Sequence, residues 1–277
     1  MASIKKSVML FVGLATAIIC SANLSVQACG VNSDCRIAGR HYRIRMPASH
    51  DGSALIGAIV YAHGYRGTAQ QVMRNKQLIK LTERLGIALI APKSAGIDWT
   101  IPGAPQHSTI DGADELVYFD RLIYDVVRRF LIDKDRLMAV GFSAGGMMIW
   151  NLACHRSHLF AGFAPIAGTF WRPIPERCTT PPASIIHMHG TSDRVVPIEG
   201  RRIANTAQGS VIRAIEMYGR YGEFETANSL TAGDLTCQRR VNPEGRLLEF
   251  CKFPGGHTFD ASYIARAWRL IGMRQQN

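Results

Sequence analysis

Short apolar runs alternate along this chain with longer amphipathic stretches. Apolar runs of about four to eight residues are typical of buried strands, whereas apolar residues spaced three and four apart are typical of helices. Strands are predicted over residues 42–46, 55–63, 87–91, 137–142, 162–167, 184–189 and 247–253. Helices are predicted over residues 70–85, 112–130, 145–154, 203–221 and 261–271.

This alternation predicts an α/β fold, in which a mostly parallel central sheet carries helices on both faces. Near-continuous apolar strands, such as residues 58–61, indicate a sheet that is buried on both faces. The roughly 250 residues of 29–277 suit one large domain of this kind. Ligands are then expected at the carboxyl ends of the strands.

The first 28 residues have the layout of a secretory signal peptide. Lys5 and Lys6 precede an apolar run over residues 8–19, and small residues lead up to Ala28. The run is too short to span a bilayer, so we expect a secreted or periplasmic protein without stable membrane insertion. Val-Gln-Ala before Cys29 loosely resembles a bacterial lipoprotein signal, but we favour simple export over lipid anchoring.

Removal of the signal would leave six cysteines in a chain bound for an oxidising compartment, where disulfides are the default. Six cysteines allow many pairings, so the connectivity stays open, although pairing neighbours closes short loops and is our preference. Cys154 and His155, with His158, could form the corner of a metal site, but export favours a disulfide, and no metal is predicted. The preferred pairs are Cys29 with Cys35, Cys154 with Cys178, and Cys237 with Cys251.

The formal net charge is +11, and removing the two lysines of the signal leaves +9. The basic residues are scattered or paired, as at Arg128-Arg129 and Arg201-Arg202, without interleaved aromatic residues. This pattern argues against nucleic-acid binding and favours a solvated basic face. Attraction to anionic polymers stays open.

The sequence Gly141-Phe142-Ser143-Ala144-Gly145 joins a predicted buried strand to a predicted helix and reads G-x-S-x-G. In this context the motif is typical of a nucleophile elbow, a strained turn that exposes a serine. Glycines at the flanking positions let the strand and the helix approach closely. The alternative is a tight turn with an incidental serine. We interpret Ser143 as the catalytic nucleophile.

A serine nucleophile needs a histidine base and an acid that orients the histidine, here in the chain order acid then histidine. Asp193 follows the predicted strand 184–189, and His257 follows the strand 247–253 in the loop Pro254-Gly255-Gly256. Either residue alone is a weak signal, because Asp193 could simply make a turn. Their joint occurrence in the required order predicts a Ser143–His257–Asp193 triad.

Ester hydrolysis also requires donors for an oxyanion. The backbone N–H of Ala144 is one candidate, and that of Tyr65, after the predicted strand 55–63, is the second. His63 is interpreted as a structural residue of this loop. His187 and His189 are interpreted as packing residues or supports of the site, and the remaining histidines with no distinguishing context are His41, His50 and His107.

Several motifs together resemble the polyhydroxybutyrate depolymerase and feruloyl esterase group of α/β-hydrolases. They are Gly-Phe-Ser-Ala-Gly-Gly-Met-Met at residues 141–148, His-Gly-Thr-Ser-Asp at 189–193 and Gly-Gly-His-Thr at 255–258. Ala91-Pro92, Trp99 and Asp114-Glu115-Leu116 extend the similarity over nearly the whole chain after the signal. The resemblance implies an α/β-hydrolase fold and a single-domain esterase without a cofactor. It also implies the same triad and the same oxyanion donors.

The chain departs from this group at two positions. The group often carries Ser-Asn-Gly-Gly at the elbow, where this chain has Ala144, and His-Thr-Trp where it has Phe259. The second change affects an aromatic residue near the catalytic histidine and leaves the substrate open. Trp99 is a candidate substrate-binding residue that could stack on an acyl group, with simple packing as the alternative.

The predicted function is hydrolysis of carboxylic esters through an acyl-enzyme. Candidate substrates are hydroxyalkanoate oligomers of the polyhydroxybutyrate type and feruloyl or acetyl esters. No separate polymer-binding module is evident, which favours small or oligomeric esters over solid polymer. The alternatives are a serine peptidase of the same fold and a non-catalytic basic surface-binding protein on a hydrolase scaffold. The oligomeric state stays open.

Overall fold

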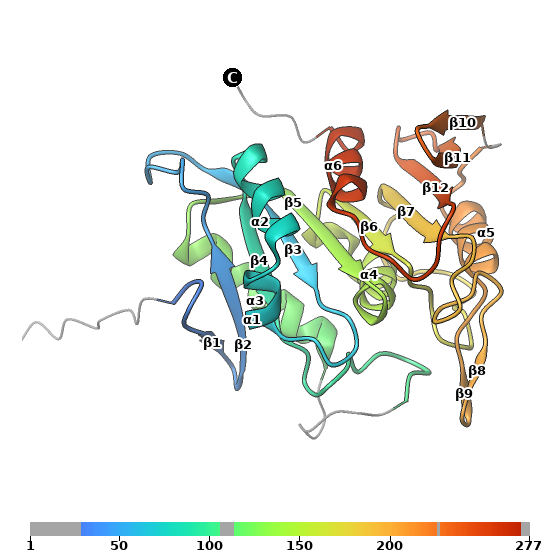
Figure 1. Ribbon diagram of the computed structural model, residues 1–277, viewed down its shortest axis with the longest axis horizontal. Helices are drawn as coiled ribbons and strands as arrows, with labels where there is room; N and C mark the ends of the chain where they lie inside the picture. Colours follow the sequence, from blue (N-terminus) through green and yellow to red (C-terminus); the bar gives the residue numbers. More distant parts are fainter. Residues whose placement is uncertain (1–28, 106–113, 226–227, 273–277) are drawn as a thin grey trace, which may run out of the picture.

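A large, twisted sheet forms the centre of the protein in the computed structural model, which describes residues 29–105, 114–225 and 228–272 (Figure 1). The sheet has ten strands in the order β1-β2-β4-β3-β5-β6-β7-β12-β11-β10. Pairing is parallel from β4 to β12 and antiparallel at both edges. The strands are β1 (Cys35–Ile37), β2 (Arg40–Arg45), β3 (Ile56–Ala62), β4 (Ala88–Pro92), β5 (Ile132–Phe142), β6 (Gly162–Ile166), β7 (Ile185–Gly190), β10 (Asn228–Ala232), β11 (Leu235–Val241) and β12 (Leu247–Phe253).

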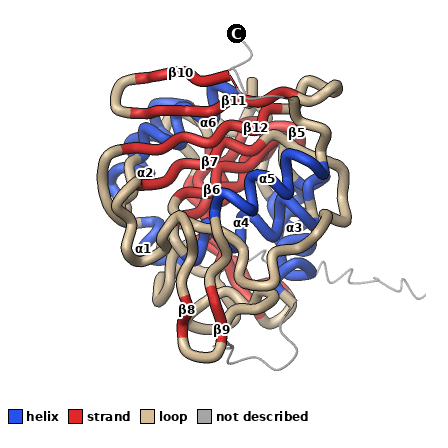
Figure 2. The backbone as a smooth tube through the Cα atoms, turned by 90° about the vertical axis from the view of Figure 1, so that its right-hand side faces the viewer, coloured by secondary structure: helices blue, strands red, loops and turns tan. Residues whose placement is uncertain are grey.

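Helices cover both faces of the sheet (Figure 2). They are α1 (Ala69–Met73), α2 (Lys76–Leu85), α3 (Glu115–Arg129), α4 (Ala144–His155), α5 (Val211–Tyr221) and α6 (Ala261–Leu270), with a short 3₁₀ helix at Ser157–Leu159. Helices α3, α4 and α5 share one apolar core with the sheet, and α1, α2 and α6 share the other. Alternate residues of β3 enter the two cores, as Val60 and Ile59 do. The predicted fold class is confirmed.

Two predicted helices differ from the structure. The helix predicted over 70–85 is two helices, because the Asn75 side chain accepts the N–H groups of Gln77 and Leu78 and begins α2 anew. The helix predicted over 203–221 begins only at Val211, where Ser210 caps it. The preceding residues form a hairpin of β8 (Arg202–Ile203) and β9 (Thr206–Ala207). This hairpin projects beyond the sheet (Figure 1).

The sequence did not reveal the edge strands β1, β10 and β11, and β5 begins five residues before its predicted start at Leu137. Few residues of these segments are buried, and none in β10, so the segments are rich in polar residues and lack the apolar runs that marked the inner strands. The predicted signal peptide, residues 1–28, and His107 lie outside the described residues. None of the helices in the described part of the chain is long and apolar enough to cross a membrane.

Three disulfides are present, and they are the pairs that the sequence favoured: Cys29–Cys35, Cys154–Cys178 and Cys237–Cys251. The second ties the end of α4 to the loop before β7. The third joins directly opposed residues of β11 and β12. The metal corner considered at Cys154 is therefore excluded for that residue, because its sulfur is in a disulfide.

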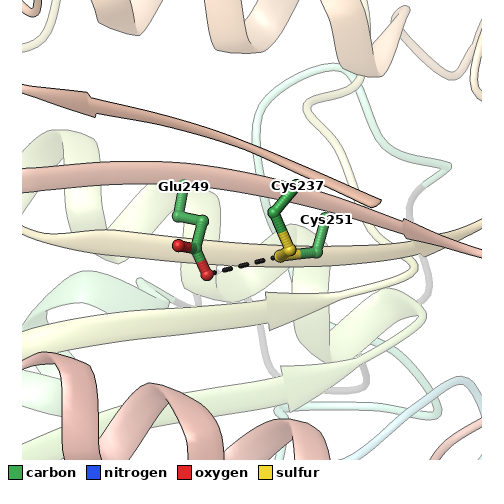
Figure 3. A group of neighbouring side chains, drawn as sticks. All are labelled: Cys237, Glu249 and Cys251. Atoms are coloured by element: carbon green, nitrogen blue, oxygen red, sulfur yellow. Dashed lines mark hydrogen bonds between the residues drawn. A yellow bond between two sulfur atoms is a disulfide. The ribbon is translucent and has the colours of Figure 1, made fainter. Parts of the chain in front are cut away.

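Cys237, Glu249 and Cys251 form a compact group of potential metal-ligand types (Figure 3). Both sulfurs belong to the disulfide and carry no proton, so the 3.3 Å approach of Cys251 Sγ to Glu249 Oε1 is a packing contact. The buried Glu249 carboxylate is paired instead with Arg239 at 2.6 Å and Arg266 at 2.9 Å. The group is therefore an ion-pair cluster beside a disulfide and not a metal site.

Replacing Cys237 and Cys251 together by alanine is expected to lower the free energy of unfolding. The bond closes a loop with a sequence separation of 14 residues. A loop of that size predicts a loss of about 3 kcal/mol. Urea unfolding of the wild type and the double variant, both without reductant, measures the difference. Equal free energies would show that this bond does not constrain the unfolded chain.

Candidate active site

Ser143 occupies a strained turn between β5 and α4. Its backbone has φ 60° and ψ −124°, a conformation that residues with a Cβ rarely adopt. The turn is held from both sides, because the Ser143 N–H donates to Ile166 O at 2.9 Å and the Met147 N–H donates to Ser143 O at 3.0 Å. Strain of this kind costs about 1–3 kcal/mol and persists only where the surroundings impose it. The geometry is that of the nucleophile elbow predicted from the sequence.

The glycines beside Ser143 let the elbow close. A Cβ on Gly145 would lie 2.0 Å from the carbonyl oxygen of Ala62 at the end of β3. A Cβ on Gly141 would lie 2.4 Å from the backbone of Gly145 across the turn. The first turn of α4 therefore packs directly on backbone of β3 and β5, where no larger residue fits. This contact places the Ala144 amide at the carboxyl end of the sheet.

Asp193 and His257 meet because the loops that carry them follow neighbouring parallel strands, β7 and β12. His257 Nδ1 donates to Asp193 Oδ2 at 2.7 Å. Asp193 Oδ1 accepts the N–H groups of Val195 and Val196, each at 2.8 Å. Because Nδ1 carries the proton in this bond, the Nε2 atom of a neutral His257 is left as a proton acceptor.

The His257 ring lies beside the elbow. It packs on the ring of Phe142, the residue before Ser143, with 4.6 Å between the ring centroids. Phe259 packs on the same Phe142 ring at 6.1 Å and on Tyr61 at 5.8 Å. Phe259 is the position where the resembled family often has tryptophan. Its ring thus packs on Phe142 and Tyr61, next to the loop that carries His257. The structure therefore brings all three predicted triad residues to one end of the sheet.

His187 and His189 form a buried hydrogen-bond chain beneath the acid. Trp150 Nε1 can only donate, and it donates to His187 Nδ1 at 3.3 Å. His187 Nε2 then donates to His189 Nδ1 at 3.0 Å, and His189 Nε2 donates to Val196 O at 2.7 Å. Burial lowers the pKa of both histidines, so both are neutral. The chain therefore anchors the loop that presents Asp193.

His63 supports the loop after β3, as the sequence suggested. Its Nε2 accepts the Ser94 N–H at 3.2 Å, so Nδ1 carries the proton and donates to Gly64 O at 2.8 Å. Burial, chiefly, lowers the pKa of His63 to about 4, although the bond to Gly64 opposes this shift and Lys93 adds to it. A neutral imidazole with both nitrogens engaged is not available as a base.

The structure does not support the expectation that Trp99 binds substrate. The side chain is 1% exposed and packs between His63 and Phe119, and its Nε1 donates to His63 O at 2.8 Å. It is not among the residues that line the pocket at Ser143. This burial assigns Trp99 to the support of the His63–Gly64 loop, which was the packing alternative.

A pocket of about 250 Å³ opens at Ser143. Tyr65 and Ala144, the two predicted oxyanion donors, line it together with Ser143. Its lining also includes residues that sequence reasoning missed: Asp98, Pro105, Met147, Trp171, Val195, Val196, Arg201, Ile203 and Gln208. Several of them come from the β8–β9 hairpin and the loop after β6, which meet only in the folded chain. No motif could have revealed them, and the predicted helix over 203–221 concealed the hairpin.

A larger hollow of about 510 Å³ lies between residues 172–176 and α5. Its lining is dominated by arginine, glutamate and proline and includes none of Ser143, Asp193 and His257. This hollow is therefore separate from the candidate site at the elbow.

This chain is similar in sequence to proteins named as esterases. No protein-family model matches the sequence. The putative esterase NocK of Nocardia uniformis is 28% identical over 260 residues, covering 85% of this chain and 76% of that protein. The probable feruloyl esterase C of Aspergillus clavatus is 23% identical over 176 residues, covering 61% of this chain and 60% of that protein. The chain thus matches less than two thirds of the length of the second relative.

Solved structures share the fold. The acetyl xylan esterase from Aspergillus awamori superposes with a TM-score of 0.60 at 12% identity, covering 84% of this chain and 93% of that one. A variant of the feruloyl esterase module from Clostridium thermocellum superposes with a TM-score of 0.56 at 12% identity, covering 86% of each chain. The chain is an esterase-like α/β-hydrolase. In this α/β-hydrolase, the elbow after β5 and the loops after β7 and β12 carry the candidate site.

Gly145→Ala is expected to destabilise the α/β-hydrolase by about 3 kcal/mol, because the new methyl group would collide with the Ala62 carbonyl and force α4 away from β3. Activity should fall with it, since the elbow moves. Gly30→Ala is the matched control, because its nearest contact would be an ordinary 3.8 Å to Ile44 O. Thermal unfolding of both variants tests this, and equal stability would contradict the close contact.

The lowered pKa of His63 predicts acid sensitivity. An unfolded histidine takes up its proton near pH 6.5, whereas folded His63 does so only near pH 4. The contribution of His63 to the free energy of unfolding therefore decreases as the pH falls through 6.5 and levels off below 4. Between pH 7 and pH 5 the free energy of unfolding should fall in both proteins, but by about 2 kcal/mol less in His63→Gln than in the wild type. Urea unfolding at the two pH values measures this difference. The same decrease in both proteins would refute the assignment.

Proposed function

We propose that Ser143, His257 and Asp193 are the catalytic triad of this carboxylic ester hydrolase. The observation that carries the proposal is the hydrogen bond from His257 to Asp193, formed beside a serine held at positive φ on a nucleophile elbow. The strain at Ser143 has no role in stability, since an unstrained turn would be more stable. Its consequence is a half-buried serine that lines a pocket.

The proposed reaction has two acyl-transfer steps. The Ser143 hydroxyl attacks the ester carbonyl while His257 Nε2 takes its proton, and Asp193 holds the imidazolium in place. The negative oxygen of the tetrahedral intermediate accepts hydrogen bonds from the backbone amides of Ala144 and Tyr65. His257 then protonates the departing alcohol. Water, activated by the same histidine, hydrolyses the acyl-enzyme and restores Ser143.

The proposed substrates are small or oligomeric carboxylic esters. Their candidate acyl groups are hydroxyalkanoyl, feruloyl and acetyl groups. A pocket of about 250 Å³ is large enough for a short aliphatic or a single-ring acyl group. The names of the relatives, esterase and feruloyl esterase, support this range. We also propose that the protein acts outside the cytoplasm. Its three disulfides support that location, because such bonds persist in oxidising compartments.

Ser143→Ala should lower kcat for p-nitrophenyl butyrate by several powers of ten, on the order seen for triad serines in general. Ser229→Ala, at an exposed position of β10, is the matched control and should keep wild-type activity. The corresponding p-nitroanilide, an amide, distinguishes an esterase from a peptidase of the same fold, and we expect the wild type to cleave only the ester. Equal ester hydrolysis by Ser143→Ala and the wild type would overturn the proposed function.

A further inference from the structure

Gln208 is fixed by its backbone at the wall of the Ser143 pocket. Its N–H donates to Arg201 O at 2.9 Å across the base of the β8–β9 hairpin, and it forms a β-bridge with Trp171. Its neighbours continue this pairing, since the Arg172 N–H donates to Ala207 O at 2.8 Å and the Gly209 N–H to Phe170 O at 2.7 Å. The hairpin and the loop after β6 thus hold residue 208 in one place.

The side chain of Gln208 has an unused hydrogen-bond acceptor. The residue is 4% exposed, and its Oε1 atom is buried without a hydrogen-bond partner in the part of the chain that the structure describes. A buried amide oxygen is unfavourable unless something donates to it. Because Gln208 lines the same pocket as Ser143, a rotation of its amide would present Oε1 to a molecule in that pocket, which can then supply the donor.

The residues that line the pocket together with Gln208 are of the kinds expected in a specificity pocket. Met147, Trp171 and Val196, all buried, provide apolar walls, and Gln208 adds a neutral polar group. The charged residues of the lining are Asp98 and Arg201. Binding pockets commonly combine an apolar lining with a few placed polar groups that fix the orientation of the ligand. A hydroxyl group is the neutral donor that suits such an acceptor, and hydroxyalkanoate and feruloyl groups, two of the candidate acyl groups, each carry one.

The pocket lies on the acyl side of the proposed reaction. His257 protonates the departing alcohol, so the alcohol part of the ester must lie toward that histidine. The pocket is lined by Ala144, the proposed oxyanion donor, and not by His257. The part of the ester that fills it is therefore the acyl group.

We propose that Gln208 is a specificity-determining residue whose Oε1 accepts a hydrogen bond from a hydroxyl group on the acyl part of the substrate. The inference rests on the proposed function, because it assumes that Ser143 attacks an ester in this pocket. The hydroxyl can belong to an aliphatic 3-hydroxyacyl group or to a phenolic acyl group.

Two pairs of esters that differ by one hydroxyl group test the proposal. They are p-nitrophenyl 3-hydroxybutyrate against p-nitrophenyl butyrate, and methyl 4-hydroxycinnamate against methyl cinnamate. In the wild type, kcat/KM should favour the hydroxylated member of at least one pair by roughly tenfold to a hundredfold. The pair that shows the preference identifies the aliphatic or the phenolic source. Equal kcat/KM within both pairs would overturn the role of Gln208 alone, whereas no hydrolysis of any member would overturn the proposed function.

Gln208→Met keeps the length of the side chain but removes the acceptor. The ratio of kcat/KM for the hydroxylated ester to kcat/KM for its partner should therefore fall close to one. Gln208→Glu keeps an acceptor in place of the amide and should retain the preference. Gln238→Met, at an exposed position of β11, is the matched control and should leave the ratio unchanged. Thermal unfolding establishes that each variant is folded. A preference that survives in Gln208→Met, or that is lost equally in Gln208→Glu, would overturn the proposal.

Discussion

The close approach of the first turn of α4 to the ends of β3 and β6 is the constraint on which the site depends. Gly145 touches the Ala62 carbonyl, and the Ser143 amide is tied to Ile166 in β6. The helix can reach these positions only if the turn after β5 is very tight, and that turn forces Ser143 to positive φ. The strands β7 and β12 are parallel neighbours, so the loops that follow them, which carry Asp193 and His257, lie at the same edge of the sheet. Backbone packing at the elbow and adjacent strands thus bring the three residues of the proposed triad to the same end of the sheet.

Much of the fold could be predicted because the inner strands are buried on both faces. A strand buried on both faces has a continuous apolar sequence. For this reason the sequence predicts β3, β5, β6, β7 and β12 to within a few residues, apart from the polar start of β5. The edge strands carry no such run. The β8–β9 hairpin was misinterpreted as helix, since its pairing depends on contacts with residues 170–172 that only the folded chain provides. Pairing of cysteines that are close in sequence, by contrast, follows from loop length, and the preferred pairs are the ones present.

The candidate site also contains residues that the sequence predicts and residues that it does not. Ser143, Asp193 and His257 could be found because each stands in a local motif after a strand, and chain order links them. Trp99 could not be placed, because a tryptophan in a loop can face the pocket or the core, and only packing on His63 decides between them. The support beneath the acid was also beyond the sequence: alternation along β7 predicts that His187 and His189 share a face, but not that Trp150 sets their tautomers. Pocket walls such as Gln208 come from loops far apart in sequence and leave no pattern.

We propose that the strained elbow and His257 together make Ser143 the reactive serine of this chain. The most direct test is to react the purified protein with a fluorophosphonate and to map the modified residue by peptide mass spectrometry. We expect one adduct per chain, on Ser143, with labelling suppressed when His257 is replaced by alanine. An adduct on a different serine, or no adduct on a folded protein, would contradict it.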